Sequence, residues 1–96
     1  MRPLVVEFLI RHPCTLCEAA RPAVTKWAGR LGARLVEHDI DAHPALVDQF
    51  GERVPVVRTP DGRVIAEGRI SEARLAWGLM VARLRSLLAR DLHTLV

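Results

Sequence analysis

Both cysteines of this 96-residue chain stand three positions apart, at Cys14 and Cys17. Side chains at positions i and i+3 of a helix have Cβ atoms about 5–6 Å apart. A disulfide needs Cα atoms about 4.4–6.8 Å apart, so the two sulfurs can form a bridge. The pair follows an apolar run over residues 4–10 and precedes a segment with helical periodicity. It therefore belongs at a helix N-terminus, where unpaired N–H groups and a partial positive charge favour thiolate over thiol. This arrangement predicts thiol–disulfide exchange.

One histidine, His12, stands two residues before the first cysteine. As an imidazolium it would further stabilise a thiolate at Cys14, whereas the carboxylate of Glu18 would oppose that effect. The alternative is that His12 is an ordinary residue of a surface loop. The sequence leaves both interpretations open.

A metal site finds little support in the sequence. A structural zinc ion needs about four ligands, and the C-x-x-C supplies two. There is no second C-x-x-C, and the remaining histidines, His38, His43 and His93, do not have the spacing of a zinc finger. We therefore expect no metal, although a carrier that holds a metal ion or an iron–sulfur cluster on the same thiols stays an alternative.

Composition narrows the class of protein. The net charge is +3, but the basic residues are scattered and only four residues are Phe or Trp, so no nucleic-acid partner is expected. The apolar runs are too short to span a membrane, and no signal peptide is recognisable. Two cysteines do not make a disulfide scaffold. We expect a reducing, cytoplasmic setting, in which a C-x-x-C is catalytic or metal-binding. The length predicts one domain over residues 1–96.

The elements that must position the cysteines follow from periodicity and turn residues. Residues 4–10 read as a buried strand and residues 15–31 as a helix that Pro22 should kink and Gly32 should end. The rest of the chain predicts the following elements: a strand over 34–40, a helix over 44–50, a hairpin over 54–58 and 63–67, and a helix over 72–90 capped by Ser71. The order is βαβαββα, an α/β sandwich whose four strands form two parallel strands and an antiparallel hairpin.

The last helix carries more apolar residues than one stripe requires. Its predicted core stripe is Trp77, Met80, Val81, Leu84, Leu87 and Leu88. Core packing is also expected for Trp27 on the first helix. The additional apolar residues, which could cover the sheet or form a dimer contact, are Leu75, Leu79, Leu92, Leu95 and Val96. We expect a monomer or a weak dimer.

Three features together resemble the thioredoxin superfamily, and most closely its small glutaredoxin-like members, over about residues 4–90. They are the C-x-x-C after the first strand, Pro22 five residues beyond the second cysteine, and Val54-Pro55 at the start of the hairpin. The resemblance implies the thioredoxin fold, a four-stranded mixed sheet flanked by helices. It also implies that Cys14 is the exposed nucleophile and Cys17 the resolving thiol.

The resemblance further implies how a substrate is held. Pro55 would be a cis-proline, and Val54 before it would pair its main chain with an extended thiol substrate. The alternative for Pro55 is an ordinary edge-strand proline. Glutathione can serve as co-substrate, with its carboxylates bound by Arg11 and by the start of the last helix near Gly68 and Ser71.

The resemblance also draws attention to Glu7, because thioredoxins carry a buried acid followed by phenylalanine before the first cysteine. Glu7 could be a desolvated general base toward Cys17. The interpretation that we favour is a glutamate that faces water or pairs with an arginine.

The expected function is therefore that of a thiol–disulfide oxidoreductase that reduces protein or mixed disulfides. Two alternatives remain open. One is a thioredoxin-like module that binds partners without catalysis, and the other is the metal or iron–sulfur carrier.

Overall fold

The computed structural model describes the backbone of residues 4–95 and the side chains of residues 4–89. Its elements are β1 (Leu4–Ile10), α1 (Thr15–Arg30), β2 (Ala33–Asp39), the 3₁₀ helix η1 (Ile40–Ala42), α2 (Pro44–Phe50), β3 (Val56–Arg58), β4 (Val64–Glu67) and α3 (Glu72–Leu95). The expected βαβαββα order is confirmed, with η1 added between β2 and α2.

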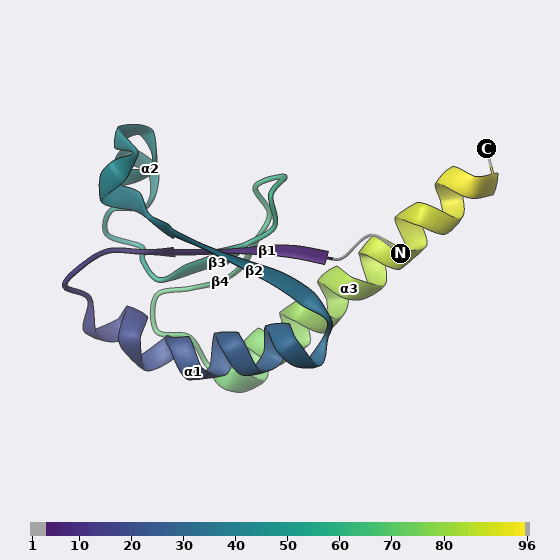
Figure 1. The fold of residues 1–96 in the computed structure, drawn as a ribbon, viewed down its shortest axis with the longest axis horizontal. Coiled ribbons are helices and arrows are strands. Elements are labelled where there is room, and N and C mark those ends of the chain that lie inside the picture. Colours follow the sequence, from purple (N-terminus) through teal and green to yellow (C-terminus); the bar gives the residue numbers. More distant parts are fainter. Residues whose placement is uncertain (1–3, 96) are drawn as a thin grey trace.

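The four strands form one mixed sheet in the order β2-β1-β3-β4. β1 pairs in parallel with β2, as the crossover through α1 requires, and antiparallel with β3. β3 and β4 form the predicted antiparallel hairpin. Figure 1 shows α1 and α3 on one side of the sheet and α2 on the other. Because β1 is a central strand, the loop from its carboxyl end to α1 starts from the middle of the sheet.

The alternation of side chains along β1 builds two cores. Val6, Phe8 and Ile10 are at most 1% exposed and pack with the inner faces of α1 and α3. Leu9 points the other way and packs in a smaller cluster with residues of η1, α2 and β3, namely Ile40, Phe50 and Val56. Burial on both faces explains why the sequence of this strand is almost continuously apolar.

Several element boundaries follow the predicted signals. Gly32, at φ +65°, follows the end of α1 as expected of a glycine after a helix. The Oγ of Ser71 accepts a hydrogen bond of 3.3 Å from the N–H of Arg74 at the start of α3. Other boundaries differ from the prediction by one residue or more. β2 ends at Asp39, whose carboxylate accepts a hydrogen bond from the N–H of Asp41 and starts η1, and α3 continues past residue 90.

The hairpin also starts later than predicted. β3 begins at Val56, so Val54 and Pro55 belong to the segment that precedes the strand. Proline has no N–H to donate to a neighbouring strand, which explains why the ladder starts after it.

The prediction for the core face of α3 is wrong. Four members of the predicted stripe are exposed, at 69% for Trp77, 48% for Met80, 56% for Leu84 and 50% for Leu88. The buried face instead consists of Leu75, Leu79 and Ala82.

The orientation of α3 is set by a close contact that no apolar count reveals. A Cβ placed on Gly78 would lie 2.6 Å from Cγ2 of Ile65, so the glycine lets the helix approach β4 closely.

Trp27 on α1 is half-buried against the main core, and its Nε1 donates a hydrogen bond to Glu72 at 3.0 Å. The side chains of Leu92 and Leu95, and Val96 as a whole, lie outside the described residues. Within residues 4–95 no helix is both long and apolar enough to cross a membrane.

Candidate active site

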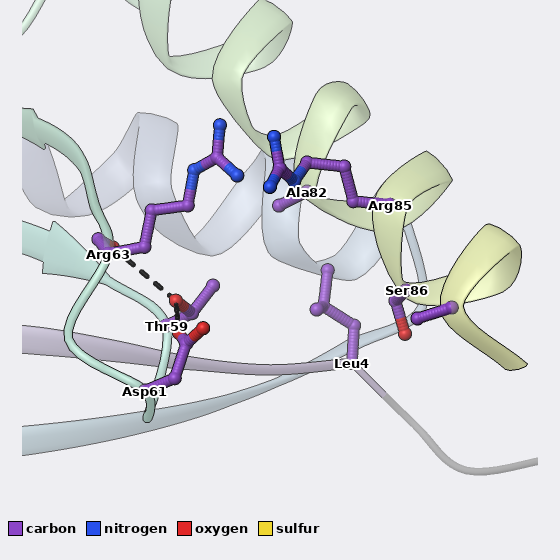
Figure 2. A pocket seen from close by; sticks show the side chains of 8 residues that line it. Leu4, Thr59, Asp61, Arg63, Ala82, Arg85 and Ser86 are labelled. Carbon is purple, nitrogen blue, oxygen red and sulfur yellow. Dashed lines mark hydrogen bonds between the residues drawn. The ribbon is translucent and has the colours of Figure 1, made fainter. Parts of the chain in front are cut away.

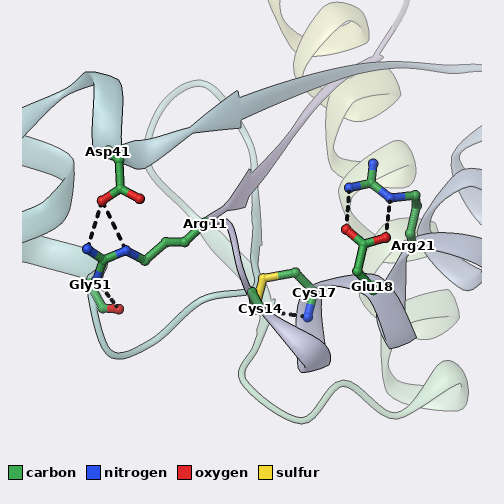
Figure 3. The surroundings of a disulfide bond; sticks show 7 residues. All are labelled: Arg11, Cys14, Cys17, Glu18, Arg21, Asp41 and Gly51. Atoms are coloured by element: carbon green, nitrogen blue, oxygen red, sulfur yellow. Dashed lines mark hydrogen bonds and ion pairs between the residues drawn. A yellow bond between two sulfur atoms is a disulfide. The ribbon is translucent and has the colours of Figure 1, made fainter.

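The two cysteines lie at the N-terminus of α1 and form a disulfide, with their Cα atoms 5.2 Å apart. Cys14 is the N-cap residue of the helix, and its Sγ accepts a hydrogen bond of 3.1 Å from the backbone N–H of Cys17. Figure 3 shows this arrangement at the first turn of the helix. The N–H groups of a first helical turn have no partner within the helix, so a sulfur in this position receives a donor and the positive end of the helix dipole. The environment favours negative charge on Sγ of Cys14.

The two sulfurs differ in access. Cys17 is 0% exposed and lies on the inner face of α1, in register with the buried Ala20 and Val24. Cys14, three residues earlier, is only partly buried at the rim of the same core. An incoming disulfide therefore meets Cys14 first.

The segment around the second proline lies beside the cysteines. The Val54–Pro55 peptide bond is cis, and so is the His12–Pro13 bond, which the sequence did not predict. Val54 and Cys14 line the same pocket of about 440 Å³. The N–H of Val54 is 3.2 Å from the carbonyl oxygen of Phe50, whereas within residues 4–95 the carbonyl of Val54 accepts no hydrogen bond. A substrate chain added at this edge could therefore donate an N–H to Val54.

Arg11 lines the same pocket, and three of its N–H groups have partners within the chain. Nε and Nη2 donate to Oδ1 of Asp41 at 3.1 and 2.7 Å, and Nη1 donates to the carbonyl of Gly51 at 3.1 Å. The hydrogen bond with the Asp41 carboxylate raises the pKa of Arg11. Part of the guanidinium is therefore engaged within the chain before any glutathione carboxylate binds.

The two other residues expected to hold glutathione have structural partners. Gly68, at φ +68°, donates its N–H to the carbonyls of Pro55 and Arg53, at 2.8 and 3.1 Å. It therefore secures the loop that carries the cis-proline. Ser71 caps α3, as described above. Neither residue lines the pocket beside Cys14.

The charged neighbours of the cysteine pair are largely compensated. Glu18 forms an ion pair with Arg21 at 3.2 Å, and the hydrogen bond from Arg21 lowers the pKa of the carboxyl. Arg21 also binds Glu37 on β2. Arg21 therefore offsets the repulsion that the Glu18 carboxylate would exert on a thiolate at Cys14. His12 is exposed and lines the pocket beside Cys14.

Glu7 lies on the face of β1 away from α1. Its neighbours Val6 and Phe8 pack in the core that contains Cys17, whereas the Glu7 carboxylate accepts a hydrogen bond of 2.9 Å from Nε of Arg58 and lies 3.1 Å from Nε2 of His38. The pairing with an arginine is thus what the structure shows. The placement contradicts a direct proton relay from Glu7 to Cys17.

Three residues that line the pocket opposite the cysteines were not predicted from the sequence. Asp41, Gly51 and Glu52 line it together with Arg11 and Cys14. These residues come from η1 and from the end of α2, so only the packing of α2 against the sheet brings them beside the cysteines. No local pattern in the sequence signals that contact. Among the described residues, no three histidine, cysteine or acidic side chains gather in an arrangement that could hold a metal ion.

A second pocket lies between the β3–β4 hairpin and α3. It measures about 360 Å³ and is lined on its two sides by Thr59, Asp61 and Arg63 and by Ala82, Arg85 and Ser86, as Figure 2 shows. It contains neither cysteine, so the chemistry of the C-x-x-C takes place elsewhere.

Comparisons with known proteins bear on the family and on the fold. The family description "Glutaredoxin-like domain (DUF836)" matches residues 5–89. No curated protein matches the chain. Among solved structures, the chain is similar to protein XcR50 of X. campestris, a Northeast Structural Genomics target, with 29% identity and a TM-score of 0.66 over 79% of this chain and 96% of that one.

Two thioredoxins are also similar. Thioredoxin 1 of the thermophilic eubacterium Thermosipho africanus TCF52B aligns with 18% identity and a TM-score of 0.64, over 92% of this chain and 99% of that one. A mutant thioredoxin of Halobacterium salinarum NRC-1 aligns with 26% identity and a TM-score of 0.59, over 78% of this chain and 70% of that one. The expected thioredoxin fold is thereby confirmed.

Proposed function

The chain belongs to the glutaredoxin-like domain family, and from this membership we propose that it is a thiol–disulfide oxidoreductase that reduces protein or mixed disulfides. The family, the fold and the C-x-x-C support a thiol redox role. The observation that carries the finer proposal is the asymmetry of the two sulfurs. Cys14 is accessible and receives a backbone donor at Sγ, whereas Cys17 is buried one turn further into the helix.

The reaction begins with the reduced dithiol. The thiolate of Cys14 attacks one sulfur of the substrate disulfide, forms a mixed disulfide and releases the other substrate sulfur as a thiolate. Cys17 then loses its proton, attacks Sγ of Cys14 and releases the second substrate thiolate. The substrate gains two electrons and two protons, and the Cys14–Cys17 disulfide forms. A thiol reductant, either glutathione or a partner reductase, must then return the pair to the dithiol.

The rim around Cys14 suits a polypeptide substrate. Leu16, between the two cysteines, is 40% exposed, and Pro13 lines the pocket with Val54. The carbonyl of Val54 supplies a main-chain acceptor for an extended segment. Glutathione as co-substrate rests on the family resemblance, since Arg11, Gly68 and Ser71 all have partners within the chain.

The remaining expectations form part of the proposal. We place the protein in a reducing compartment such as the cytoplasm, because a reactive C-x-x-C turns over between dithiol and disulfide there. It would act as one domain over residues 1–96, as a monomer or weak dimer, without a resident metal and without a nucleic-acid or membrane partner.

Reduction of an insulin-type disulfide and of a glutathionylated peptide tests the proposal. The reduced wild type should reduce at least one of them, and Cys14→Ser should abolish the activity. Cys17→Ser should stop at the mixed disulfide, which mass spectrometry detects as an adduct on Cys14. A matched control is Asp61→Asn, in the turn of the β3–β4 hairpin, which should retain full activity.

The opposite results identify the alternatives. A wild type that reduces neither substrate, but binds one equivalent of metal after anaerobic purification, would be a carrier. A wild type with neither property would leave only the binding module. Limiting iodoacetamide on the reduced protein adds a direct check of access, because it should modify Cys14 before Cys17.

A further inference from the structure

The groove beside Cys14 is acidic, although the chain as a whole is basic with a net charge of +3. The pocket of about 440 Å³ that contains Cys14 adjoins a pocket of about 520 Å³ along α2, and the two share Arg11, Gly51 and Glu52. The pocket along α2 adds Asp48 and Arg53. Together they form one surface, which we call the α2 groove.

Both arginines of the α2 groove are neutralised by neighbouring carboxylates. Arg11 is bound to Asp41 at 2.7 Å. Arg53 is bound to Glu67 on β4, with 2.6 Å between Nη2 and Oε2. Each arginine charge of the groove is therefore offset by one carboxylate.

Two acidic residues of the α2 groove, unlike its arginines, have no oppositely charged partner among the described residues. Within the described residues, the carboxylates of Glu52 and Asp48 make no hydrogen bond or ion pair, and both side chains are exposed. Glu52 lies in the pocket that Cys14 lines, and Asp48 lies further along the groove. His12 is the remaining titratable side chain at the Cys14 end. The groove thus presents one uncompensated negative charge, that of Glu52, in the pocket of the reacting sulfur, and a second one, that of Asp48, further along α2.

We propose that Glu52 is a specificity-determining residue, which selects polypeptide disulfides that carry a lysine or arginine close to the reacting cysteine. This inference rests on the proposed thiol–disulfide exchange. While the substrate sulfur bonds to Sγ of Cys14, the cationic side chain lies in the groove and pairs with the Glu52 carboxylate. The bonds formed and broken at sulfur stay those described above. The carboxylate lowers the free energy of the encounter and of the mixed disulfide for a cationic substrate and raises both for an anionic one.

The same charge works against glutathione disulfide, whose carboxylates outnumber its amino groups. An acidic residue is a poor neighbour for such a ligand, and no described arginine of the groove lacks a carboxylate partner. The structure therefore favours a basic polypeptide over glutathione as the substrate that oxidises this dithiol.

Three model peptides make the test. They share one sequence with a mixed disulfide to a neutral thiol and differ only at the residue next to the cysteine, which is Arg, Ser or Glu. The second-order rate constant for oxidation of the reduced protein is measured for each at low salt by quenched alkylation. An exposed ion pair changes such a rate up to about fivefold, so the Arg peptide should react roughly fivefold to tenfold faster than the Glu peptide. At about 1 M salt, where the screening length falls to about 3 Å, the ratio should approach one.

Variants assign the preference to one residue. Glu52→Gln should remove most of the difference between the Arg and Glu peptides, and Glu52→Lys should reverse it. Asp61→Asn changes the net charge as Glu52→Gln does, but lies in the hairpin turn, so it should keep the wild-type ratio. Reversal by Glu52→Lys is a result that a purely structural role of residue 52 would not produce.

The outcomes separate this inference from the function on which it rests. If the wild type reacts with none of the peptides, the oxidoreductase proposal fails. If it reacts with all three at equal rates, or if Glu52→Lys keeps the preference for Arg, exchange stands and the role of Glu52 is refuted. A faster reaction with the Glu peptide would also refute it.

Discussion

Substitution of Glu7 by glutamine separates a structural role of this carboxylate from a role in proton transfer. In the structure Glu7 binds Nε of Arg58 at 2.9 Å and lies 3.1 Å from Nε2 of His38, and its side chain is only 17% exposed. Glutamine keeps one oxygen acceptor but loses the charge and one acceptor. Hydrogen bonds to charged groups contribute about 1.5–3 kcal/mol each. Because one contact survives and water reaches part of this site, we expect Glu7→Gln to lower the free energy of unfolding by about 1–2 kcal/mol, near the low end of that range.

The matched control is Glu67→Gln, which removes the charge of an exposed pair. Glu67 and Arg53 are 42% and 44% exposed, and exposed pairs contribute about 0.2–1 kcal/mol. In a domain of this size 1 kcal/mol moves Tm by about 4–8 °C, so Glu7→Gln should lower Tm by about 5–15 °C. By the same conversion the control should lower Tm by about 1–8 °C, and by less than Glu7→Gln does. Thermal unfolding followed by circular dichroism measures both.

Activity provides the second readout. Because the Glu7 carboxylate faces away from the core that holds Cys17, the pH profile of disulfide reduction by Glu7→Gln should match that of the wild type. The reasoning is refuted if Glu7→Gln and Glu67→Gln lose equal stability. It is also refuted if the pH profile of Glu7→Gln is displaced while the protein remains folded.

Two further predictions concern stability. Leu79→Ala should cost about 2–5 kcal/mol in urea unfolding and Leu84→Ala less than about 0.5 kcal/mol, because Leu79 is fully buried and Leu84 is 56% exposed; similar losses would contradict the observed face of α3. Hydrogen bonds from Lys26 and Trp27 lower the pKa of Glu72 in the folded protein, so this carboxylate stabilises the fold above its ordinary pKa of 4.5 and that contribution is lost as acid protonates it. Urea midpoints should therefore decline less on acidification in Glu72→Gln than in the wild type, and equal declines would exclude this linkage.

Much of the fold follows from local signals in the sequence. The run over β1, the helix bounds around Gly32 and Ser71, and the turn between β3 and β4 all follow from propensities that act within a few residues. Which face of α3 points outward does not follow from local signals. Apolar residues occupy most of its circumference, so periodicity alone could not tell the buried face from the exposed one. The contact of Gly78 with Ile65 decides that, and it depends on where β4 lies in the sheet.

The candidate site likewise has features that the sequence predicts and features that it does not. The family resemblance implied that Cys14 is the more accessible of the two cysteines, and in the structure Cys14 is partly buried whereas Cys17 is fully buried. The engagement of Arg11 could not be predicted, because its partners Asp41 and Gly51 are 30 and 40 residues away. The acidic character of the α2 groove depends on the same long-range packing, since it results from which charges find partners and which do not.

Arg11 has a mechanical consequence beyond its charge. Its guanidinium fastens three separate pieces of chain, namely the residue that follows β1, Asp41 in η1 and Gly51 after α2. These hydrogen bonds hold one side of the pocket beside Cys14 and do not involve the disulfide. The pocket should therefore keep its shape when the disulfide is reduced, so that substrate binding and electron transfer can be altered separately.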